Sequence, residues 1–212
     1  LLRPLRPPAY ERLMTDACPP ADLHQSLTAD VADHRLELLF DGGDRLTRLL
    51  DLINGAAHSI DLIMYIFEGD GAGRRILDAL LLAAKRGVRV RAVIDSFGSG
   101  DTPESLFVPL REAGGSVTFF SRRWRSTYLI RNHQKLILID DYIAVTGGFN
   151  IADDYLSPPR SDCWFDIGMI VKGPTVIHAA RWFEEIHDYT VNDDGKVLTL
   201  RRLSSIGLRV PQ

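Results

Sequence analysis

The chain has 212 residues, of which 45% are hydrophobic and 25% charged, so it can bury a full core and has the composition of an ordinary globular protein. Its formal net charge of −3 excludes a whole-chain attraction to nucleic acid or anionic lipid, and any such attraction must be local. No apolar run approaches the roughly 20 residues that a membrane-spanning helix needs. Cys18 and Cys163 lack metal-ligand spacing. We do not expect a disulfide between them, and we therefore expect a reducing setting.

The N-terminal part of the chain differs in pattern from the rest. Residues 1–35 contain five prolines and show no sustained alternation of polar and apolar residues. We expect an N-terminal extension there, with short helices at about 10–14 and 20–27. The pattern changes at Leu36, which begins a domain over residues 36–190. Residues 191–212 are expected to be a C-terminal linker or tail with a short strand at 196–200.

Strands and amphipathic helices alternate from Leu36 onward. The expected strands are 36–40, 59–67, 88–94, 116–120, 133–140, 142–146 and 165–171. The expected helices run from Asp41 to about 56, over 71–86 with Gly87 as the C-cap, over 103–113, and over 174–187. This order predicts an α/β fold, in which a mixed β-sheet is flanked by helices on both faces as an α-β-α sandwich.

The segment from His133 to Asn150 holds the residues that suit chemistry best. It reads His133-Gln-Lys135-Leu-Ile-Leu-Ile-Asp140, then Gly147-Gly148-Phe-Asn150 after a six-residue gap. Residues two apart on a strand point to the same face, so the imidazole and the ammonium should project together. An imidazole, a cation and a carboxamide that meet at one point suit attack on a phosphodiester and stabilisation of its transition state.

The spacing His-x-Lys-x4-Asp-x6-Gly-Gly-x-Asn resembles the signature of the phospholipase D superfamily. Flanking segments, from Leu36 to Tyr189, are similar to the N-terminal half of bacterial cardiolipin synthases. These include Tyr65-Ile-Phe67-Glu68, Asp95-Ser-Phe-Gly98-Ser and Trp164-Phe-Asp166. The resemblance implies a phospholipase D-like lobe that carries one copy of the motif. No Asp, Glu or His cluster has metal-ligand spacing, and a His nucleophile with Lys and Asn needs no metal, so we expect chemistry without a metal or other cofactor.

The resemblance assigns roles to individual residues. It implies that His133 is the nucleophile, that Lys135 and Asn150 bind phosphate, and that the backbone at Gly148 comes close to the ligand. Asp166 would hydrogen-bond the imidazole. Asp140 belongs to the catalytic motif, although an equally good reading is a carboxylate that caps the turn. Two further residues are expected to bind substrate at the rim of the site: Glu68, and Arg131, which follows the basic segment Arg122-Arg-Trp-Arg125.

The resemblance favours a phosphatidyltransferase that moves a phosphatidyl group through a phosphohistidine to an alcohol such as phosphatidylglycerol. Two alternatives stay open. One is a phospholipase D-type phosphodiesterase, or a single-motif homodimeric nuclease for which nucleic acid would be the partner. The other is a phosphate-binding half-site that is inactive alone.

His-x-Lys occurs once in the sequence, so we expect a second lobe from a missing C-terminal half or a homodimer mate. Phospholipid at the cytoplasmic face of the bacterial inner membrane, reached peripherally or through an anchor outside this chain, is the expected setting.

Overall fold

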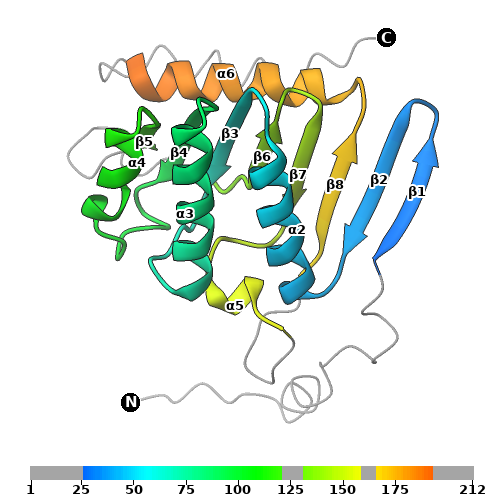
Figure 1. Ribbon diagram of the computed structural model, residues 1–212, viewed down its shortest axis with the longest axis horizontal. Coiled ribbons are helices and arrows are strands. Elements are labelled where there is room, and N and C mark those ends of the chain that lie inside the picture. Colours follow the sequence, from blue (N-terminus) through cyan, green and yellow to red (C-terminus); the bar gives the residue numbers. More distant parts are fainter. Residues whose placement is uncertain (1–25, 121–130, 159–165, 193–212) are drawn as a thin grey trace, which may run out of the picture.

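The computed structural model describes residues 26–120, 131–158 and 166–192. Eight strands form one sheet in the order β1-β2-β8-β7-β6-β3-β4-β5 (Figure 1). The sheet is mixed, because β3, β4 and β5 are parallel and the other pairs are antiparallel. The expected helix at 10–14, both cysteines, the basic segment 122–125 and the strand at 196–200 lie outside the described residues.

A hairpin of β1 (Leu27–Val31) and β2 (His34–Leu39) forms one edge of the sheet (Figure 1). The sheet therefore begins at Leu27, and the expectation of an extension up to residue 35 is wrong for this segment. Leu27, the last residue of the helix expected at 20–27, starts a strand instead. All five residues of β1 are exposed. Because neither face of this strand is buried, its sequence lacks the alternation of apolar and polar residues that would predict a strand.

The parallel part of the sheet is built from β3 (Ser59–Met64), β4 (Arg89–Asp95) and β5 (Ser116–Phe120). Helix α2 (Gly42–Gly55) precedes β3, and its N-cap Asp41 accepts from the N–H of Asp44 at 2.9 Å. Helix α3 (Gly71–Lys85) joins β3 to β4 and is capped in the same way by Asp70. Gly87 follows with a φ of +93°, which confirms it as the residue that ends this helix.

The antiparallel part consists of β6 (Leu136–Ile139), β7 (Ile143–Gly147) and β8 (Gly168–Lys172). Asp140 and Asp141 form the predicted turn between β6 and β7, with φ values of +52° and +54°. Two successive residues in this left-handed region match the twist that a tight hairpin needs, and Asp tolerates it better than most residues.

Three helical segments complete the fold. The single helix expected at 103–113 is a 3-10 helix at Glu104–Phe107 followed by α4 (Val108–Glu112), with Pro109 in the first turn, where its missing N–H costs least. A short helix α5 (Asp153–Leu156) follows the Gly147–Asn150 segment and was not predicted. Helix α6 (Val176–Asn192) is longer than the helix expected at 174–187.

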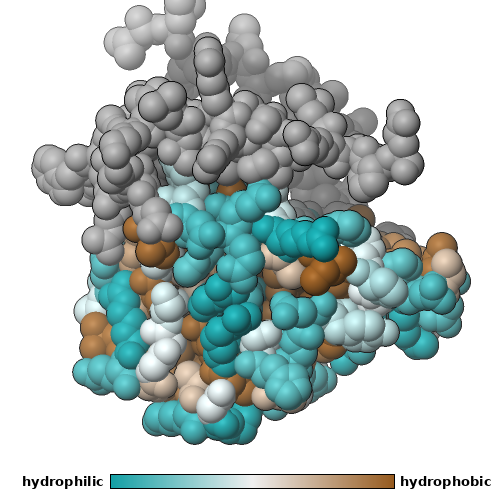
Figure 2. Space-filling view, turned by 90° about the horizontal axis from the view of Figure 1, so that it is seen from above, coloured by the Kyte–Doolittle hydropathy of each residue, from teal (hydrophilic) through white to brown (hydrophobic). Residues whose placement is uncertain are grey.

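Helices cover both faces of the sheet, as predicted. Helices α2 and α3 lie side by side on one face, above a core that includes Leu49, Ile76 and Ile94. The other face packs against α6, where Phe183 and Ile186 contact strand residues. From the side of α6, the described surface is mostly hydrophilic, with small separate hydrophobic patches (Figure 2).

The contact between the sheet and α6 is partly ionic. Asp61 on β3 is buried on this face and accepts two hydrogen bonds from Arg91, each 2.7 Å long. Arg91 also donates to both carboxylate oxygens of Glu184 on α6, and its guanidinium lies 4.8 Å from the centre of the Phe183 ring. A charge buried beneath a helix needs such a partner, so these bonds fix where α6 crosses the sheet.

Candidate active site

One edge of the sheet collects the residues singled out by the motif. Strand β6 begins where its antiparallel neighbours β3 and β7 end, and β8 begins where β7 ends. His133 and Lys135 therefore lie beside Tyr65, which follows β3, and beside the segment that leads from Gly147 to Asn150. In sheets with parallel strands, ligands commonly bind at the carboxyl ends of those strands. The parallel strands β3 and β4 both end at this edge of the sheet.

His133 and Lys135 are in contact. The side chain of His133 is exposed, whereas Lys135 is only 6% exposed. The Lys135 Nζ lies 3.3 Å from Nδ1 and 3.4 Å from Nε2 of His133, and it donates to the His133 carbonyl at 2.9 Å. Since Nζ is almost equally far from both ring nitrogens, it is not directed at either lone pair. The ring faces solvent with a buried cation beside it, an arrangement suited to attack on an anion.

These two residues precede the strand rather than lie on it. Strand β6 starts at Leu136, so the prediction of one strand from His133 to Asp140 is wrong at its start. Side-chain hydrogen bonds hold this segment instead. Asn132 Oδ1 accepts from the N–H of Gln134 at 3.1 Å, and Gln134 Oε1 accepts from the indole N–H of Trp182 on α6 at 2.9 Å. Local side-chain acceptors of this kind compete with a strand ladder.

Burial and a nearby anion act on Lys135 in opposite directions. Desolvation lowers the pKa of Lys135 below its ordinary value, and the negative charge of Asp166 opposes this by raising it. The net shift is downward. Asp166 is therefore close enough to Lys135 to act on its protonation.

Asp166 does not hydrogen-bond to the His133 ring, contrary to what the resemblance implied. Within the described part of the chain, its Oδ1 accepts from the N–H of Ile167 at 2.7 Å. Its carboxylate instead packs on Gly148, where a Cβ atom would lie 2.3 Å from Asp166 Oδ1. Gly148 thus brings the backbone close to this carboxylate, and its N–H donates to the Ile167 carbonyl at 3.4 Å. A phosphate-binding role for Gly148 stays a prediction.

Arg45 holds the backbone of this region from inside the fold. It is 1% exposed and donates to the carbonyls of Asp166 at 2.6 Å and Tyr155 at 2.7 Å. It also donates to the Phe40 carbonyl at 3.0 Å. Desolvation lowers the pKa of this guanidinium, and nearby carboxylates, first Asp166, oppose the shift.

Asn150 is placed beside the end of β3. Its side chain is 2% exposed, and Oδ1 accepts from the N–H of Ile66 at 3.2 Å. The next residue, Ile151, exchanges backbone bonds with the same segment, donating to Ile66 and accepting from Glu68. Because Oδ1 is engaged with the protein, the Nδ2 group is the end of Asn150 that is suited to a phosphate oxygen.

Asp140 is separated from His133 by the length of the four-residue strand β6, about 13 Å at the usual rise of a strand. Its carboxylate accepts from the N–H groups of Ala57, His58 and Ser59 at 2.9, 2.7 and 2.8 Å. Desolvation raises the pKa of Asp140, but these bonds outweigh it and the net shift is downward. The catalytic expectation for Asp140 is therefore corrected in favour of the structural reading: it fastens the hairpin turn to the start of β3.

The two rim residues have different surroundings. Glu68 is exposed, and its pKa is raised by desolvation and then by Asp70, Asp154, Asp101 and Asp153. Such an acidic neighbourhood does not suit direct contact with a phosphate. Arg131 is half-buried near the site, with its guanidinium 4.0 Å from the centre of the Phe97 ring.

Two residues at the site carried no assigned role in the sequence. The Tyr65 ring centre lies 4.4 Å from that of His133 and 5.2 Å from Lys135 Nζ. Asp95, 1% exposed, accepts from the N–H of Asn132 at 2.8 Å, directly before His133. Both stood in the flanking segments that resemble cardiolipin synthases, and Asp95 ends a strand of strict alternation. Those were the only signals that could have found them.

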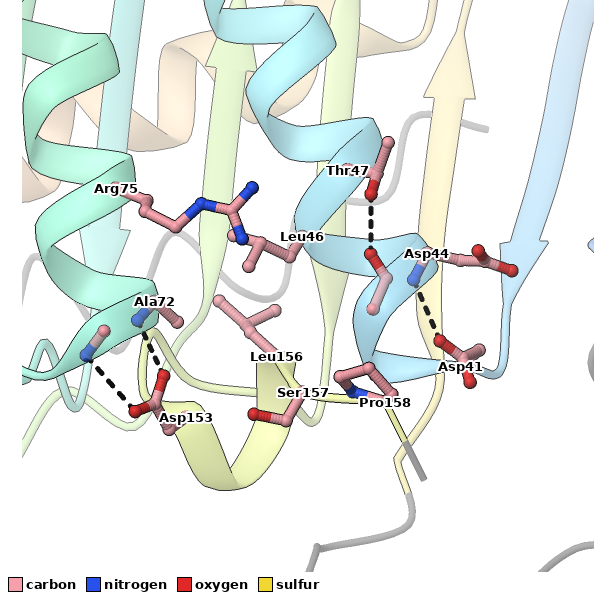
Figure 3. A pocket seen from close by; sticks show the side chains of 12 residues that line it. Asp41, Asp44, Leu46, Thr47, Ala72, Arg75, Asp153, Leu156, Ser157 and Pro158 are labelled. Carbon is pink, nitrogen blue, oxygen red and sulfur yellow. Dashed lines mark hydrogen bonds between the residues drawn. The ribbon is translucent and has the colours of Figure 1, made fainter. Parts of the chain in front are cut away.

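A hollow of about 480 Å³ lies between the N-termini of α2 and α3, and Arg75 reaches into it (Figure 3). Helix N-termini attract anions, but these are already capped. Asp41 accepts from Asp44, and Asp153 accepts from the N–H groups of Gly71 and Ala72 at 3.2 and 2.7 Å. The hollow is lined by none of the predicted site residues.

The described residues contain one cluster with a donor set suited to a metal, which the sequence did not indicate. The ligand atoms of Glu184, His187 and Asp188 on α6 lie within 4.8 Å of one another. Both Glu184 oxygens are held by Arg91 at 2.6 and 2.9 Å, and a guanidinium in that position opposes a cation. None of the helices in the described ranges is long and apolar enough to cross a membrane.

Comparisons with known proteins show the family and the fold. A family model described as "Cardiolipin synthase, PLD-like domain" matches residues 49–187. The major cardiolipin synthase ClsA of Bacillus subtilis is 38% identical over 170 residues, covering 75% of this chain and 35% of that protein. The chain thus spans about a third of the length of the curated relatives it matches.

Solved structures show the same fold. Nuc from Salmonella typhimurium, a phospholipase D family member, has a TM-score of 0.56 at 22% identity, covering 74% of this chain and 93% of that one. The phosphatidylserine synthase of Haemophilus influenzae has a TM-score of 0.59 at 17% identity, covering 81% and 40%. At these identities the likeness extends to the fold alone.

Proposed function

Because the chain belongs to the phospholipase D-like family described by the cardiolipin synthase model, we propose that it is a catalytic lobe of a phosphatidyltransferase, with His133 as the nucleophile. One observation carries the proposal: an exposed imidazole lies against the ammonium of a buried lysine at the sheet edge. The cation cannot move away into solvent, so it is fixed where the charge of a phosphodiester would come.

The reaction then has two halves. A ring nitrogen of His133 attacks phosphorus, the N–P bond forms, and the bond from phosphorus to the leaving alkoxide breaks. Lys135 and the Nδ2 group of Asn150 hold the non-bridging oxygens as negative charge builds. An alcohol then attacks the phosphohistidine, giving its proton to a base while the N–P bond breaks. Phosphatidylglycerol as donor and acceptor would yield cardiolipin and glycerol.

The leaving alkoxide needs a proton that His133 cannot give while it acts as nucleophile. We propose that a second His-x-Lys supplies it, from a second lobe of a longer chain or from another copy of this one. The sequence holds one such motif, and His133 is exposed. Phe97 and Ile167, next to residues of the site, are 53% and 43% exposed, which leaves apolar surface for a lobe to cover. Substrate would be taken from a membrane surface.

The test is to trap the intermediate. Wild type, His133→Ala and His133→Asn would be mixed with phosphatidylglycerol vesicles, and the protein mass and lipid products measured. His178→Asn, an exposed histidine on α6, serves as the control. We expect a phosphatidyl adduct and cardiolipin for wild type and the control, and neither for the His133 variants.

The products separate the alternatives. Phosphatidic acid without cardiolipin would indicate a hydrolase, and cleavage of DNA without lipid turnover would indicate a nuclease. Turnover that persists in His133→Asn would overturn the mechanism. Light scattering on the active species would show whether the second motif comes from a second copy.

A further inference from the structure

We infer that the loop Asp95–Ser99 positions the active site: Asp95 holds the segment that carries His133, and Ser99 holds the segment that carries Tyr65. The inference rests on the proposed function of His133. Gly98 lies in this loop and Gly100 follows it, and glycines in a loop can allow phosphate binding. The contacts of this loop indicate another role.

Asp95 joins the end of β4 to the residue before His133. Its Oδ1 accepts from the N–H groups of Phe97 and Gly98, both at 2.9 Å, and its Oδ2 accepts from the N–H of Asn132 at 2.8 Å. The side chain is 1% exposed. Each carboxylate oxygen is thus engaged with backbone, so one rigid group fixes two segments that are far apart in the sequence.

Ser99 joins the same loop to the end of β3. Its Oγ donates to the Tyr65 carbonyl at 3.1 Å and accepts from the N–H of Phe67 at 3.0 Å. Gly98 allows this approach, because a Cβ atom there would lie 2.2 Å from the Tyr65 carbonyl oxygen. Tyr65 in turn packs against His133, with the two rings tilted at 55°. The imidazole is therefore held from its own backbone and from its aromatic neighbour by one loop.

The loop has no N–H groups left for a phosphate between Phe97 and Gly100. Phe97 and Gly98 donate to the Asp95 side chain, Ser99 donates to the Asp95 carbonyl, and Gly100 donates to the Phe97 carbonyl. A phosphate-binding loop needs such groups directed at the ligand. Here they are used to fold the loop on itself.

The His133 segment depends on this support because it lies outside the strand ladder. Its described ties are the Asp95 bond at Asn132, the Lys135 bond to the His133 carbonyl, and the bond between Gln134 and Trp182. Removing the first would let the imidazole shift relative to Lys135. Misplacement by about 1 Å can cost about 10²-fold in rate.

The test compares Asp95→Asn with Asp140→Asn, which changes a carboxylate of the same bonding pattern at the other end of β6. The amide that replaces the Asp95 carboxylate would present an N–H₂ group to the Asn132 N–H, or lose its bonds to Phe97 and Gly98. We expect kcat on phosphatidylglycerol vesicles to fall about 10²-fold while KM stays within about twofold. The His133 ring and Asn132 amide NMR resonances should shift in Asp95→Asn and stay unchanged in Asp140→Asn.

A milder variant covers the case in which Asp95→Asn does not fold. Ser99→Ala removes the bonds to Tyr65 and Phe67, and we expect kcat to fall about tenfold with a smaller shift of the His133 ring resonances. Unchanged His133 resonances in a folded Asp95→Asn protein, or in Ser99→Ala when Asp95→Asn does not fold, would overturn the inference. If wild type shows neither a phosphatidyl adduct nor turnover, the proposed function fails for this chain without a second lobe, and the NMR comparison still decides whether the loop positions His133.

Discussion

The two ends of β6 are held by the same chemistry and serve different purposes. At one end, Asp140 accepts from the backbone N–H groups of Ala57, His58 and Ser59. At the other, Asp95 accepts from those of Phe97, Gly98 and Asn132. Asp140 belongs to the sequence motif yet lies far from His133, whereas Asp95 lies outside the motif and holds the residue before it. Membership in a motif therefore does not place a residue in the site.

The largest expected effect is at the His133 end. We expect Lys135→Gln to lower kcat by about 10²–10³-fold, because it removes the fixed cation beside the developing negative charge. The free energy of unfolding should be unchanged or higher, since a buried charge no longer has to be desolvated. Steady-state kinetics and urea unfolding measure the two effects, and the exposed Lys85→Gln is the control. If Lys135→Gln strongly lowered the free energy of unfolding and kept full kcat, Lys135 would have the structural role that is expected of Asp140.

The opposite outcome is expected at the Asp140 end. Asp140→Asn should lower the free energy of unfolding by about 2 kcal/mol, because three backbone donors lose a charged acceptor, while kcat of the folded protein is unchanged. Asn tolerates the positive φ, so the loss reports the bonds rather than backbone strain.

The difference between wild type and Asp140→Asn should depend on pH with a definite sign. The folded pKa of Asp140 is lowered, so its stabilisation is present above the ordinary carboxyl pKa and is lost as pH falls through the folded value. Urea unfolding at about pH 7 and about pH 3 should show the difference narrowing in acid. A gap that widens in acid, or a loss of kcat, would contradict the structural role.

A smaller effect is expected from Asp166→Asn, which sharpens the description of the His133 end. The Asp166 charge raises the pKa of Lys135, against the larger lowering by desolvation. Removing that charge should lower the pKa further, so the alkaline limb of kcat/KM should move to lower pH. A pH–rate profile measures the shift, with Asp154→Asn on α5 as a control. If the alkaline limb of the kcat/KM profile moved to higher pH in Asp166→Asn, that limb would not report the protonation of Lys135.

The fold was largely predictable because its signals are local. The Asp41 cap, Gly87 and the alternation in β4 placed α2, the end of α3 and β4 close to their observed bounds. The sequence did not predict elements whose burial leaves no periodic pattern of apolar and polar residues. Strand β1 has no buried side, and α5 is a single turn whose Asp153 is held by contacts with the start of α3.

The site was predictable in its members more than in its connections. The contact between His133 and Lys135, and the burial of Asn150, agree with the grouping that the motif indicated. The partners of Asp140 and Asp95 could not be read from spacing, because the tertiary fold brings them near: Asp140 accepts from N–H groups 81 to 83 positions away and Asp95 from one 37 positions away. A carboxylate that accepts hydrogen bonds from backbone N–H groups leaves no periodic pattern in the sequence from which its partners could be predicted.

Arg45 has a consequence for the order in which the protein can fold. It is buried, and its carbonyl partners Tyr155 and Asp166 lie 110 and 121 positions further along the chain. Contacts of such long sequence separation form late, because the intervening chain must first be ordered. During synthesis, α2 would emerge with an arginine that can already reach the Phe40 carbonyl, while its acceptors at Tyr155 and Asp166 do not yet exist. The segment that carries Asp166 can therefore be fixed only after residues 155 to 166 have been made, and the sheet edge near His133 is among the last described parts of the molecule to form.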